Sequence, residues 1–182
     1  MSNKVIIAAA GSGKTTHLIE TALQARNAII LITTFTEENE KEIRTRFFER
    51  NGCIPSNVVI QTWFSFLLQH GVKPYQGYMY DKNIAGLVLV NGQSAFGSRE
   101  TDIERHYLTG DKKIYSDKIA KFACRCDERS NGAVISRLSK IYTHIFIDEV
   151  QDLAGYDLEF LDKLFLSPLE ILLVGDPPVS YT

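Results

Sequence analysis

A short apolar run followed by a glycine-containing loop constrains the fold of this chain most strongly. Residues 4–9 read KVIIAA, Gly11 and Gly13 follow, and residues 14–26 repeat apolar side chains at helical spacing. This order predicts a strand, a loop and a helix, and the run is typical of a buried parallel strand. Inward-turned amides of such a loop and the N-terminus of the next helix form a site for phosphate groups.

The loop carries the groups that a polyphosphate requires. Its glycines let backbone N–H groups turn onto the oxygens, Lys14 neutralises the outer phosphates, and the Thr15 hydroxyl can coordinate magnesium. The sequence departs from the pattern G-x-x-x-x-G-K-[ST] only where Ala8 replaces the first glycine. The alternative is a Gly-Ser turn beside an accidental lysine. The predicted nucleotide-binding residues of the loop are Ala10, Gly11, Ser12, Gly13, Lys14, Thr15 and Thr16.

A later apolar run, at 143–148, delivers two acids to the end of a strand. In an open parallel sheet, ligands bind at the carboxyl ends of the strands. We therefore expect Asp148 to hold magnesium together with Thr15, and Glu149 to orient and deprotonate a water for attack on the terminal phosphate. The alternative is that these adjacent acids cap the following helix.

Strands and helices alternate through most of the chain, which predicts βαβ units and an α/β fold. We expect a central parallel sheet flanked by helices. The further predicted strands are 28–34, 57–61 and 170–174, and the further predicted helices are 37–50, 62–70 and 155–166. The glycine-rich middle of the chain alternates poorly and is read as an insertion with helices near 99–108, 112–124 and 130–140. The expected domains are 1–70 with 141–182, and an inserted, mostly helical subdomain over 71–140.

Charge is distributed unevenly along the chain. The formal net charge is −2, so bulk charge does not favour a polyanion as partner. Residues 145–182 hold eight acids and one lysine, whereas residues 112–125 hold five basic residues and one acid. Nucleic-acid binding would therefore require a local patch. Taken alone, the basic stretch at 112–125 is either such a patch or a solvated helix face.

Cysteine usage and hydropathy bear on the compartment. The three cysteines are an odd and sparse set, which is typical of a reducing, intracellular compartment. No apolar stretch has the length of a membrane span, and the N-terminus shows no secretion signal. We therefore expect a cytoplasmic protein. Cys124 and Cys126 form only a C-x-C pair, so ordinary thiols are expected rather than a zinc site.

Five segments then follow one another in a recognisable order. They are AAAGSGKTT, ILITTFTEENEKEIRTRF, VVIQTWFSFLL, IFIDEVQDL and ILLVGDP. This series resembles motifs I, Ia, Ib, II and III of the first RecA-like domain of the UvrD/Rep-like superfamily 1 helicases. The resemblance covers roughly 1–70 and 143–176, and the middle suits the subdomain that this family inserts. The DEVQD form, with Gln151, separates this family from most other phosphate-loop ATPases.

The resemblance implies an ATP-dependent DNA helicase or translocase that uses ATP and Mg²⁺. It places Gln151 and Asp176 among the residues that couple the nucleotide to DNA. It also implies that the catalytic residues are Lys14, Glu149 and Gln151, and that Asp176 is one of the nucleotide-binding residues. It implies contacts with single-stranded DNA by Thr34, Phe35, Thr36, Thr62, Trp63 and Phe64. Stacking of bases on aromatic side chains contributes about 1–3 kcal/mol each. The alternative for Phe35, Trp63 and Phe66 is core packing.

The sequence departs from the family pattern in three places. The upstream segment whose glutamine reads adenine is missing, residues 175–182 (GDPPVSYT) lack the glutamine of motif III, and no second RecA-like domain follows. Arginine fingers contribute roughly 10³–10⁵ in rate. We therefore expect this chain to bind nucleotide but to hydrolyse it slowly unless a second domain, in cis or in trans, completes the site.

Two other functions remain open at this stage. One is a nucleotide-gated module that binds ATP and a partner protein or nucleic acid without unwinding, and a nuclease is a possible partner. The other is a different phosphate-loop enzyme, such as a small-molecule kinase, against which the DEVQD form argues. No membrane partner is expected.

Overall fold

The computed structural model describes residues 3–9 and 11–177. The chain forms two compact units. The first comprises Met1–Trp63, Ser139–Ala154 and Leu164–Thr182, and the second comprises Phe64–Leu138 and Gly155–Lys163. The domain limits expected from the sequence, 1–70 with 141–182 and 71–140, stay a prediction.

The first unit is built on a five-stranded parallel sheet. Its strand order is β1-β7-β6-β2-β3, with β1 at Lys4–Ile7, β2 at Ile30–Thr34, β3 at Val58–Thr62, β6 at His144–Ile147 and β7 at Glu170–Gly175. In the middle of the sheet, Ile32 of β2 pairs with Ile60 on one side and Phe146 on the other. The α/β fold with a central parallel sheet, as in RecA-like P-loop proteins, is confirmed.

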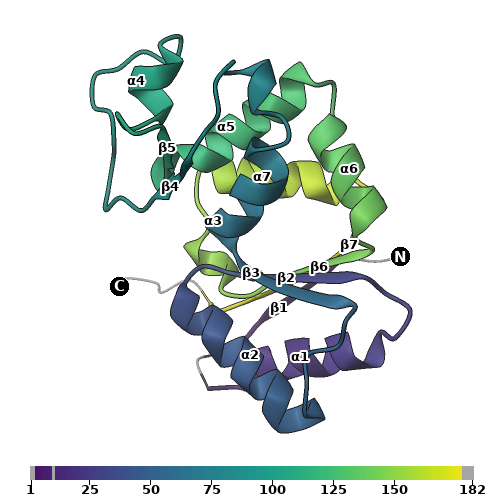
Figure 1. Ribbon diagram of the computed structural model, residues 1–182. Coiled ribbons are helices and arrows are strands. Elements are labelled where there is room, and N and C mark those ends of the chain that lie inside the picture. The colour runs from purple at the N-terminus through teal and green to yellow at the C-terminus, as the bar shows by residue number, and fades with distance from the viewer. Residues whose placement is uncertain (1–2, 10, 178–182) are drawn as a thin grey trace. The chain divides into compact units, whose positions relative to one another are not determined.

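Two helices cover one face of this sheet (Figure 1). They are α1, Lys14–Gln24, and α2, Glu37–Asn51. The buried residues that join them to the strands include Leu18 and Ile19 of α1, Phe47 of α2 and Ile32 of β2. The helix α2 begins and ends where its sequence predicts. Thr36 accepts a hydrogen bond from the Asn39 amide, and Gly52 adopts the left-handed conformation (φ 74°) that terminates the helix.

The strand β1 lies at an edge of the sheet, which corrects the expectation of a buried strand. Among the described strands, only β7 pairs with it. The side chains of Val5 and Ile7 are 59% and 49% exposed. An apolar run indicates that its side chains favour burial, but it does not indicate whether one or two neighbouring strands pair with it.

The second unit contains a π-helical turn where the sequence predicted that a helix would end. The helix α3, Trp63–Phe66, continues as a π-helix over Leu67–Val72, so Gly71 lies within the turn. A Cβ on Gly71 would lie 2.7 Å from the Cβ of Ala123 in α5, Ser116–Arg129. Gly71 is therefore a residue of close helix contact and not a helix terminator.

The rest of the second unit differs partly from the predicted insertion. Its elements include β4, Gly86–Val88; α4, Ile103–Tyr107; β5, Lys113–Tyr115; and the larger parts of α6, Ala133–Ile141, and α7, Tyr156–Phe165. A short 3-10 turn lies at Gln76–Tyr78 in this unit, and another lies at Val150–Asp152 in the first unit. Residues 113–115, predicted as helix, form a strand that pairs in parallel with β4. Strand pairing with residues about 27 positions away overrides local helix propensity there.

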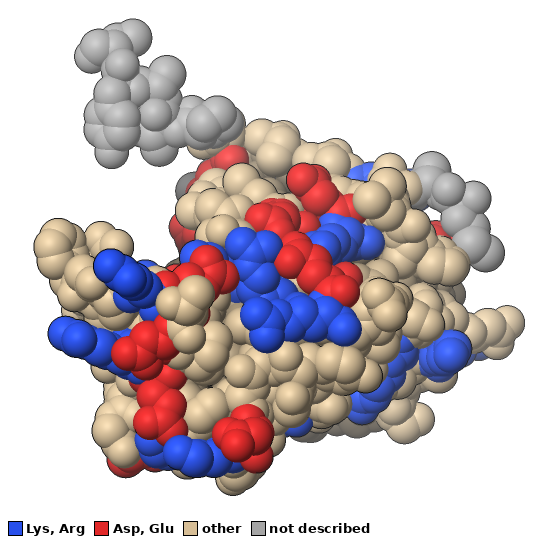
Figure 2. All heavy atoms as spheres, turned by 90° about the horizontal axis from the view of Figure 1, so that it is seen from above, with Lys and Arg blue, Asp and Glu red and all other residues tan. Residues whose placement is uncertain are grey.

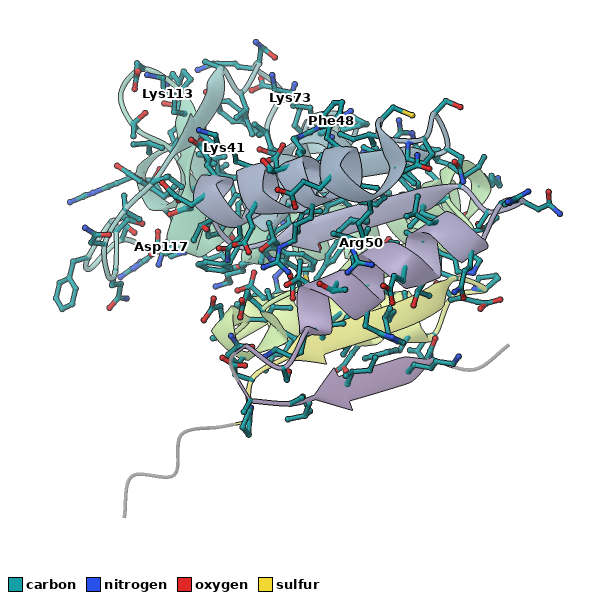
Figure 3. All side chains as sticks on the ribbon, turned by 90° about the horizontal axis from the view of Figure 1, so that it is seen from below. Lys41, Phe48, Arg50, Lys73, Lys113 and Asp117 are labelled. Atoms are coloured by element: carbon teal, nitrogen blue, oxygen red, sulfur yellow. The ribbon has the colours of Figure 1, made fainter. Side chains whose placement is uncertain are left out.

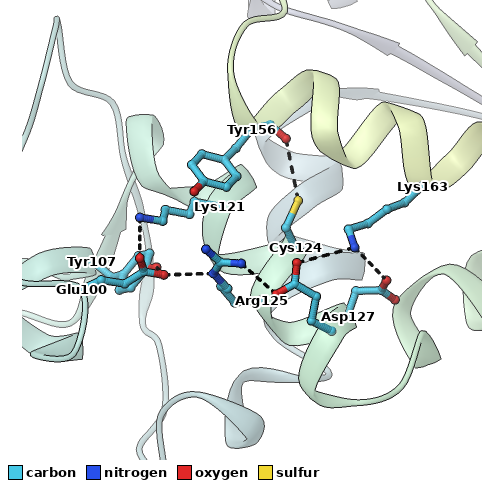
Figure 4. A network of polar contacts seen from close by, with 9 residues as sticks. Glu100, Tyr107, Lys121, Cys124, Arg125, Asp127, Tyr156 and Lys163 are labelled. Atoms are coloured by element: carbon cyan, nitrogen blue, oxygen red, sulfur yellow. Dashed lines mark hydrogen bonds and ion pairs between the residues drawn. The ribbon is translucent and has the colours of Figure 1, made fainter.

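The basic stretch at 112–125 is neutralised by acids of its own unit. Each of its five basic residues has an ion pair: Lys112 with Glu104, Lys113 with Asp111, Lys118 with Asp117, and Lys121 and Arg125 with Glu100. Figure 4 shows the last two, together with Tyr156, over whose ring both cations lie. Figure 2 likewise shows positive and negative side chains beside one another on the face it draws. These pairs favour the solvated-face interpretation of the stretch over a free patch for nucleic acid.

Candidate nucleotide site

The loop between β1 and α1 has the backbone that phosphate binding requires. Gly11 and Gly13 adopt positive φ values of 75° and 85°, a region that L side chains rarely occupy. Gly13 caps α1, and the His17 amide donates to the Gly13 carbonyl at 2.9 Å to close the first helical turn. The first amides of a helix lack partners within the helix, so they are available to an anion. The predicted contact at Ala10 lies outside the described residues.

The Lys14 side chain is held by two carbonyl oxygens of the loop and by a carboxylate. Its ammonium group donates to the carbonyl oxygens of Ala8 and Ala9 at 2.7 and 3.0 Å. It also forms an ion pair with the Asp176 carboxylate, which follows β7. The Lys14 side chain is only 8% exposed. These contacts fix the cation beside the position that loop and helix offer to phosphate.

Thr15 and Asp148 meet at the carboxyl edge of the sheet. The Thr15 hydroxyl donates to Asp148 Oδ2 at 3.1 Å, and the Asp148 amide donates to the Thr33 carbonyl at 2.8 Å. Burial raises the pKa of Asp148, which is 4% exposed, because desolvation disfavours the carboxylate. A hydroxyl and a carboxylate are oxygen ligands of the kind that Mg²⁺ binds, and a cation would relieve the cost of burying this charge. The residues present therefore fit a magnesium site.

Glu149 follows Asp148 directly, and Gln151 lies in the 3-10 turn Val150–Asp152 that comes next. Glu149 has φ 57° and ψ 43°, a left-handed conformation that costs a non-glycine residue roughly 1–2 kcal/mol. Strained backbone of this kind gathers at functional sites. The Gln151 amide group donates to the Glu149 carboxylate, and Gln151 Oε1 accepts from the Asp176 amide at 2.9 Å. Gln151 thereby links Glu149, which follows β6, to the segment after β7.

This edge of the sheet brings together most residues predicted for nucleotide chemistry. Lys14 pairs with Asp176, Thr15 contacts Asp148, and Gln151 connects Asp176 to Glu149. The direct pairing of Lys14 with Asp176 was not predicted from the sequence, because 162 positions separate the two residues. Another contact that was not predicted joins Arg46 of α2 to Thr16, where Arg46 Nη1 donates to the hydroxyl at 3.2 Å.

Most of the residues predicted to contact DNA have buried or partly buried side chains. Thr34, Thr62 and Trp63 are buried, with Trp63 only 1% exposed. Phe35 and Phe64 are partly buried, while Thr36 is exposed and its hydroxyl caps α2. A base could stack on Trp63 only after that side chain moved. The DNA contacts of these six residues stay a prediction.

Cys124 and Cys126, expected from the sequence to be ordinary thiols, lie in the described part of the chain. Cys124 and Cys126 are buried free thiols, and burial raises the pKa of each to about 12, which disfavours the thiolate that binds metals. Among the described residues there is no group of three or more His, Cys, Asp or Glu residues that could hold a metal ion.

None of the helices in the described part of the chain has both the length and the apolar character needed to cross a membrane.

Comparison with known proteins adds the family. A protein-family model described as an AAA domain matches residues 1–180. The chain belongs to this AAA domain family. Its members are P-loop NTPases, so the loop at Gly11–Thr15 lies in a nucleotide-binding domain of that class. A search of curated proteins found no match.

Proposed function

We propose that this AAA domain is the ATP-binding motor domain of a UvrD-like DNA helicase or translocase. The observation that carries the nucleotide part is the meeting of Thr15 with Asp148, beside Lys14, at the carboxyl edge of a parallel sheet. The family membership supports a P-loop NTPase. The resemblance of motifs Ia, Ib and II to UvrD/Rep-like helicases supports DNA as the polymer on which it acts.

Each residue of the site has a role that its position supports. The amides of the glycine loop bind the phosphate chain, and Lys14 leaves Asp176 to bind the outer phosphates. Asp148 and Thr15 provide the oxygen ligands for magnesium. Bound Mg²⁺ supplies charge neutralisation for the phosphates during transfer to water. Glu149 accepts the proton of the attacking water, and Gln151 positions the Glu149 carboxylate through its amide group.

In this proposal, ATP hydrolysis drives movement along DNA only together with a second domain and bound DNA. A second RecA-like domain, in cis or in trans, would supply the arginine that stabilises charge in the transition state. Single-stranded or partly duplex DNA would bind along the segments that contain Phe35 and Trp63. A nuclease or other protein is a further proposed partner, and the sparse free cysteines support a cytoplasmic setting.

A second candidate is a nucleotide-gated binding module that does not move along DNA. The observation that favours it is the neutralisation of the basic stretch, since all five basic residues of 112–125 have acidic partners. In this case ATP binding would alter contact with a protein or nucleic acid, without unwinding.

ATP turnover measured with and without single-stranded DNA tests the proposal. Turnover that DNA stimulates, and that Lys14→Ala and Glu149→Gln abolish, is the expected result. Lys73→Ala is a matched control, because it removes an exposed lysine of the second unit. ATP binding without turnover, with or without an added second domain, would instead support the binding module. Transfer of phosphate to a metabolite would overturn both candidates.

A further inference from the structure

Phe96 is the most exposed aromatic residue among those that the structure describes. It is 87% exposed and belongs to the second unit, in the loop that joins β4 to α4 (Figure 1). A single exposed apolar side chain is common on protein surfaces. The significance of Phe96 therefore depends on how the loop holds it and on which charges lie beside it.

The loop is fixed to the start of α5 by hydrogen bonds. The Ser94 amide donates to Asp117 Oδ2 at 2.9 Å, and the Ser94 hydroxyl donates to Oδ1 of the same carboxylate. The Val90 amide donates to Ser116 Oγ at 3.0 Å. Asp117, labelled in Figure 3, lies in the first turn of α5. The chain that leads to Phe96 is therefore attached at two points to a helix of its own unit.

The backbone next to Phe96 is strained and is held by contacts of the loop. Ala95 has φ 49°, in the left-handed region that residues with a Cβ rarely adopt. The Ser98 amide and hydroxyl both donate to the Ala95 carbonyl, and Ser98 Oγ lies 2.9 Å from His106 Nδ1 of α4. Strained backbone persists where surrounding contacts enforce it, and such positions gather at ligand-binding sites. The loop therefore presents Phe96 to solvent in a conformation that its own contacts impose.

Two arginines near Phe96 differ from the basic residues of 112–125. Arg99 and Arg105 are exposed, and among the described residues their guanidinium groups have no acidic partner. Arg99 lies three positions after Phe96, and Arg105 precedes His106, whose ring contacts the loop. Their charges are therefore available to a negatively charged ligand.

The acids of the same segment are committed to other partners. They are Glu100, which pairs with Lys121 and Arg125, Glu104, which pairs with Lys82 and Lys112, and Asp102, which caps α4. The surface around Phe96 thus lacks the pairing that neutralises 112–125, and it offers the local positive charge that nucleic-acid binding requires in a chain of net negative charge.

An exposed phenyl ring beside unpaired arginines matches the chemistry of a single strand. Bases of any sequence stack on aromatic side chains, while basic groups follow the phosphate backbone. Arginine binds phosphate through the planar fork of its guanidinium group. In a duplex the faces of the bases are already stacked on one another, so a ring of this kind favours unpaired bases.

We propose that the 89–99 loop binds single-stranded nucleic acid, with a base stacked on Phe96 and the backbone beside Arg99 and Arg105. This inference rests on the proposed function, which takes DNA as the polymer. It names a contact in the second unit that lies outside the segments from which that function was inferred.

Fluorescence anisotropy with two labelled strands tests this contact. One strand is an oligothymidylate, and the other is an abasic DNA of the same length, which has the phosphates but no bases. Phe96→Ala is expected to weaken binding of the oligothymidylate by about tenfold, as for the loss of one stacked base, and to leave the abasic strand within about twofold. Phe96→Trp keeps an aromatic face and is expected to retain the wild-type affinity.

The arginines are tested by the same titrations at several salt concentrations. Arg99→Gln is expected to weaken both strands several-fold at low salt and to reduce the salt dependence by about one released ion. Leu166→Ala removes an exposed apolar side chain from the first unit and is expected to change neither affinity. Because Phe96 and Arg99 are exposed, their variants are expected to fold as the wild type does.

Contrary outcomes separate this contact from the proposed function. Wild-type affinity of Phe96→Ala for the oligothymidylate would overturn the contact and leave the helicase proposal intact, since DNA would still bind. Equal loss of both strands in Phe96→Ala would also overturn it, because the ring would then not act by stacking. Wild-type protein that binds ATP but no oligothymidylate would overturn the contact together with the DNA part of the proposed function. Failure to bind ATP would overturn the proposed function itself, whatever the loop binds.

Discussion

Lys14 and Asp176 form an ion pair at the edge of the sheet where the phosphate loop lies. The same ammonium group donates to the carbonyl oxygens of Ala8 and Ala9. Hydrogen bonds to ionised groups are about twice as strong as neutral ones, so these contacts compete with any phosphate for Lys14. The cation is pre-positioned, but a nucleotide must displace its carboxylate partner.

Replacing Asp176 with asparagine tests this competition. Asp176→Asn removes the counter-ion of Lys14 and one negative charge from the phosphate position. We expect the affinity for MgATP to rise by about three- to tenfold, equal to roughly 0.7–1.4 kcal/mol. Fluorescence titration with a labelled ATP analogue measures it. Lys14→Ala is the opposite control and is expected to lose binding. A weaker affinity in Asp176→Asn would mean that the carboxylate supports the nucleotide directly.

The close contact between β7 and the turn after β6 gives a second prediction. A Cβ on Gly175 would lie 2.5 Å from Gln151 Oε1 and 2.7 Å from Val150 Cγ1. Gly175→Ala therefore displaces Gln151 from the Asp176 amide and from Glu149. We expect a loss of about 1–3 kcal/mol in the free energy of unfolding, as for other overpacked sites. Urea denaturation measures this change.

A glycine in open space provides the control for this substitution. Gly110 has no heavy atom within 4 Å of an added Cβ, so Gly110→Ala should leave stability within about 0.5 kcal/mol of the wild type. Equal effects of the two alanine variants would show that the contact with Gln151 does not constrain Gly175. ATP turnover is expected to fall in Gly175→Ala alone, because Gln151 positions Glu149.

Much of the nucleotide site could be predicted because its determinants are local. The loop from Gly11 to Thr15 needs only adjacent residues, and Asp148 ends an apolar strand. Parallel strands place their carboxyl ends at one edge, so two separate motifs could be expected to meet. The link between Lys14 and Asp176 depends instead on the order of strands, in which β7 lies next to β1.

The second unit was predicted less well because its order depends on distant partners. The strand β5 needs β4 beside it, and the π-helical turn depends on the close approach of Gly71 to Ala123. Neither partner can be read from the local sequence. The five basic residues of 112–125 present the same difficulty, since acids such as Glu100 and Glu104 neutralise them only after folding.

Glu100 gives a prediction about charge in the second unit. It pairs with Lys121 and Arg125 and accepts a hydrogen bond from the buried Tyr107 hydroxyl at 2.9 Å (Figure 4). Glu100→Ala frees Lys121 and leaves Arg125 with Glu128 as its remaining acidic partner, so we expect single-stranded DNA to bind several-fold more tightly at low salt and with a steeper salt dependence. Fluorescence anisotropy at several salt concentrations measures both quantities.

A charge-matched control separates this local effect from net charge. Glu49→Ala removes one exposed acid from α2 in the first unit, away from Phe35 and Thr36, and should leave the salt dependence unchanged. Unchanged DNA affinity in Glu100→Ala would show that freeing Lys121 creates no site for the phosphate backbone. Glu100→Ala should also lower the free energy of unfolding by about 1–3 kcal/mol, because the Tyr107 hydroxyl loses its acceptor.

His70 predicts how the second unit responds to acid. Burial, and then the nearby Arg137 charge, lower the pKa of His70 from 6.5 to about 4. The unfolded chain therefore takes up a proton near pH 6.5 that the folded chain refuses until about pH 4. The contribution of neutral His70 to the free energy of unfolding is expected to be fully present above pH 6.5. It is expected to fall by on the order of 2–3 kcal/mol as the pH drops from 6.5 to 4. Urea denaturation across this range measures the loss.

A variant without a titrating ring isolates this contribution from that of the acids. His70→Gln lacks the proton-binding group, so its stability should change less between pH 6.5 and 4 than that of the wild type. The difference between the two curves removes the shared contribution of groups such as Glu100. Burial raises the pKa of Glu100, but hydrogen bonds from Lys121, Arg125 and Tyr107 outweigh it and lower the pKa to about 2. Parallel curves for both proteins would contradict the buried neutral state of His70. A protonated His70 beside Arg137 would then have to be tolerated by the native fold.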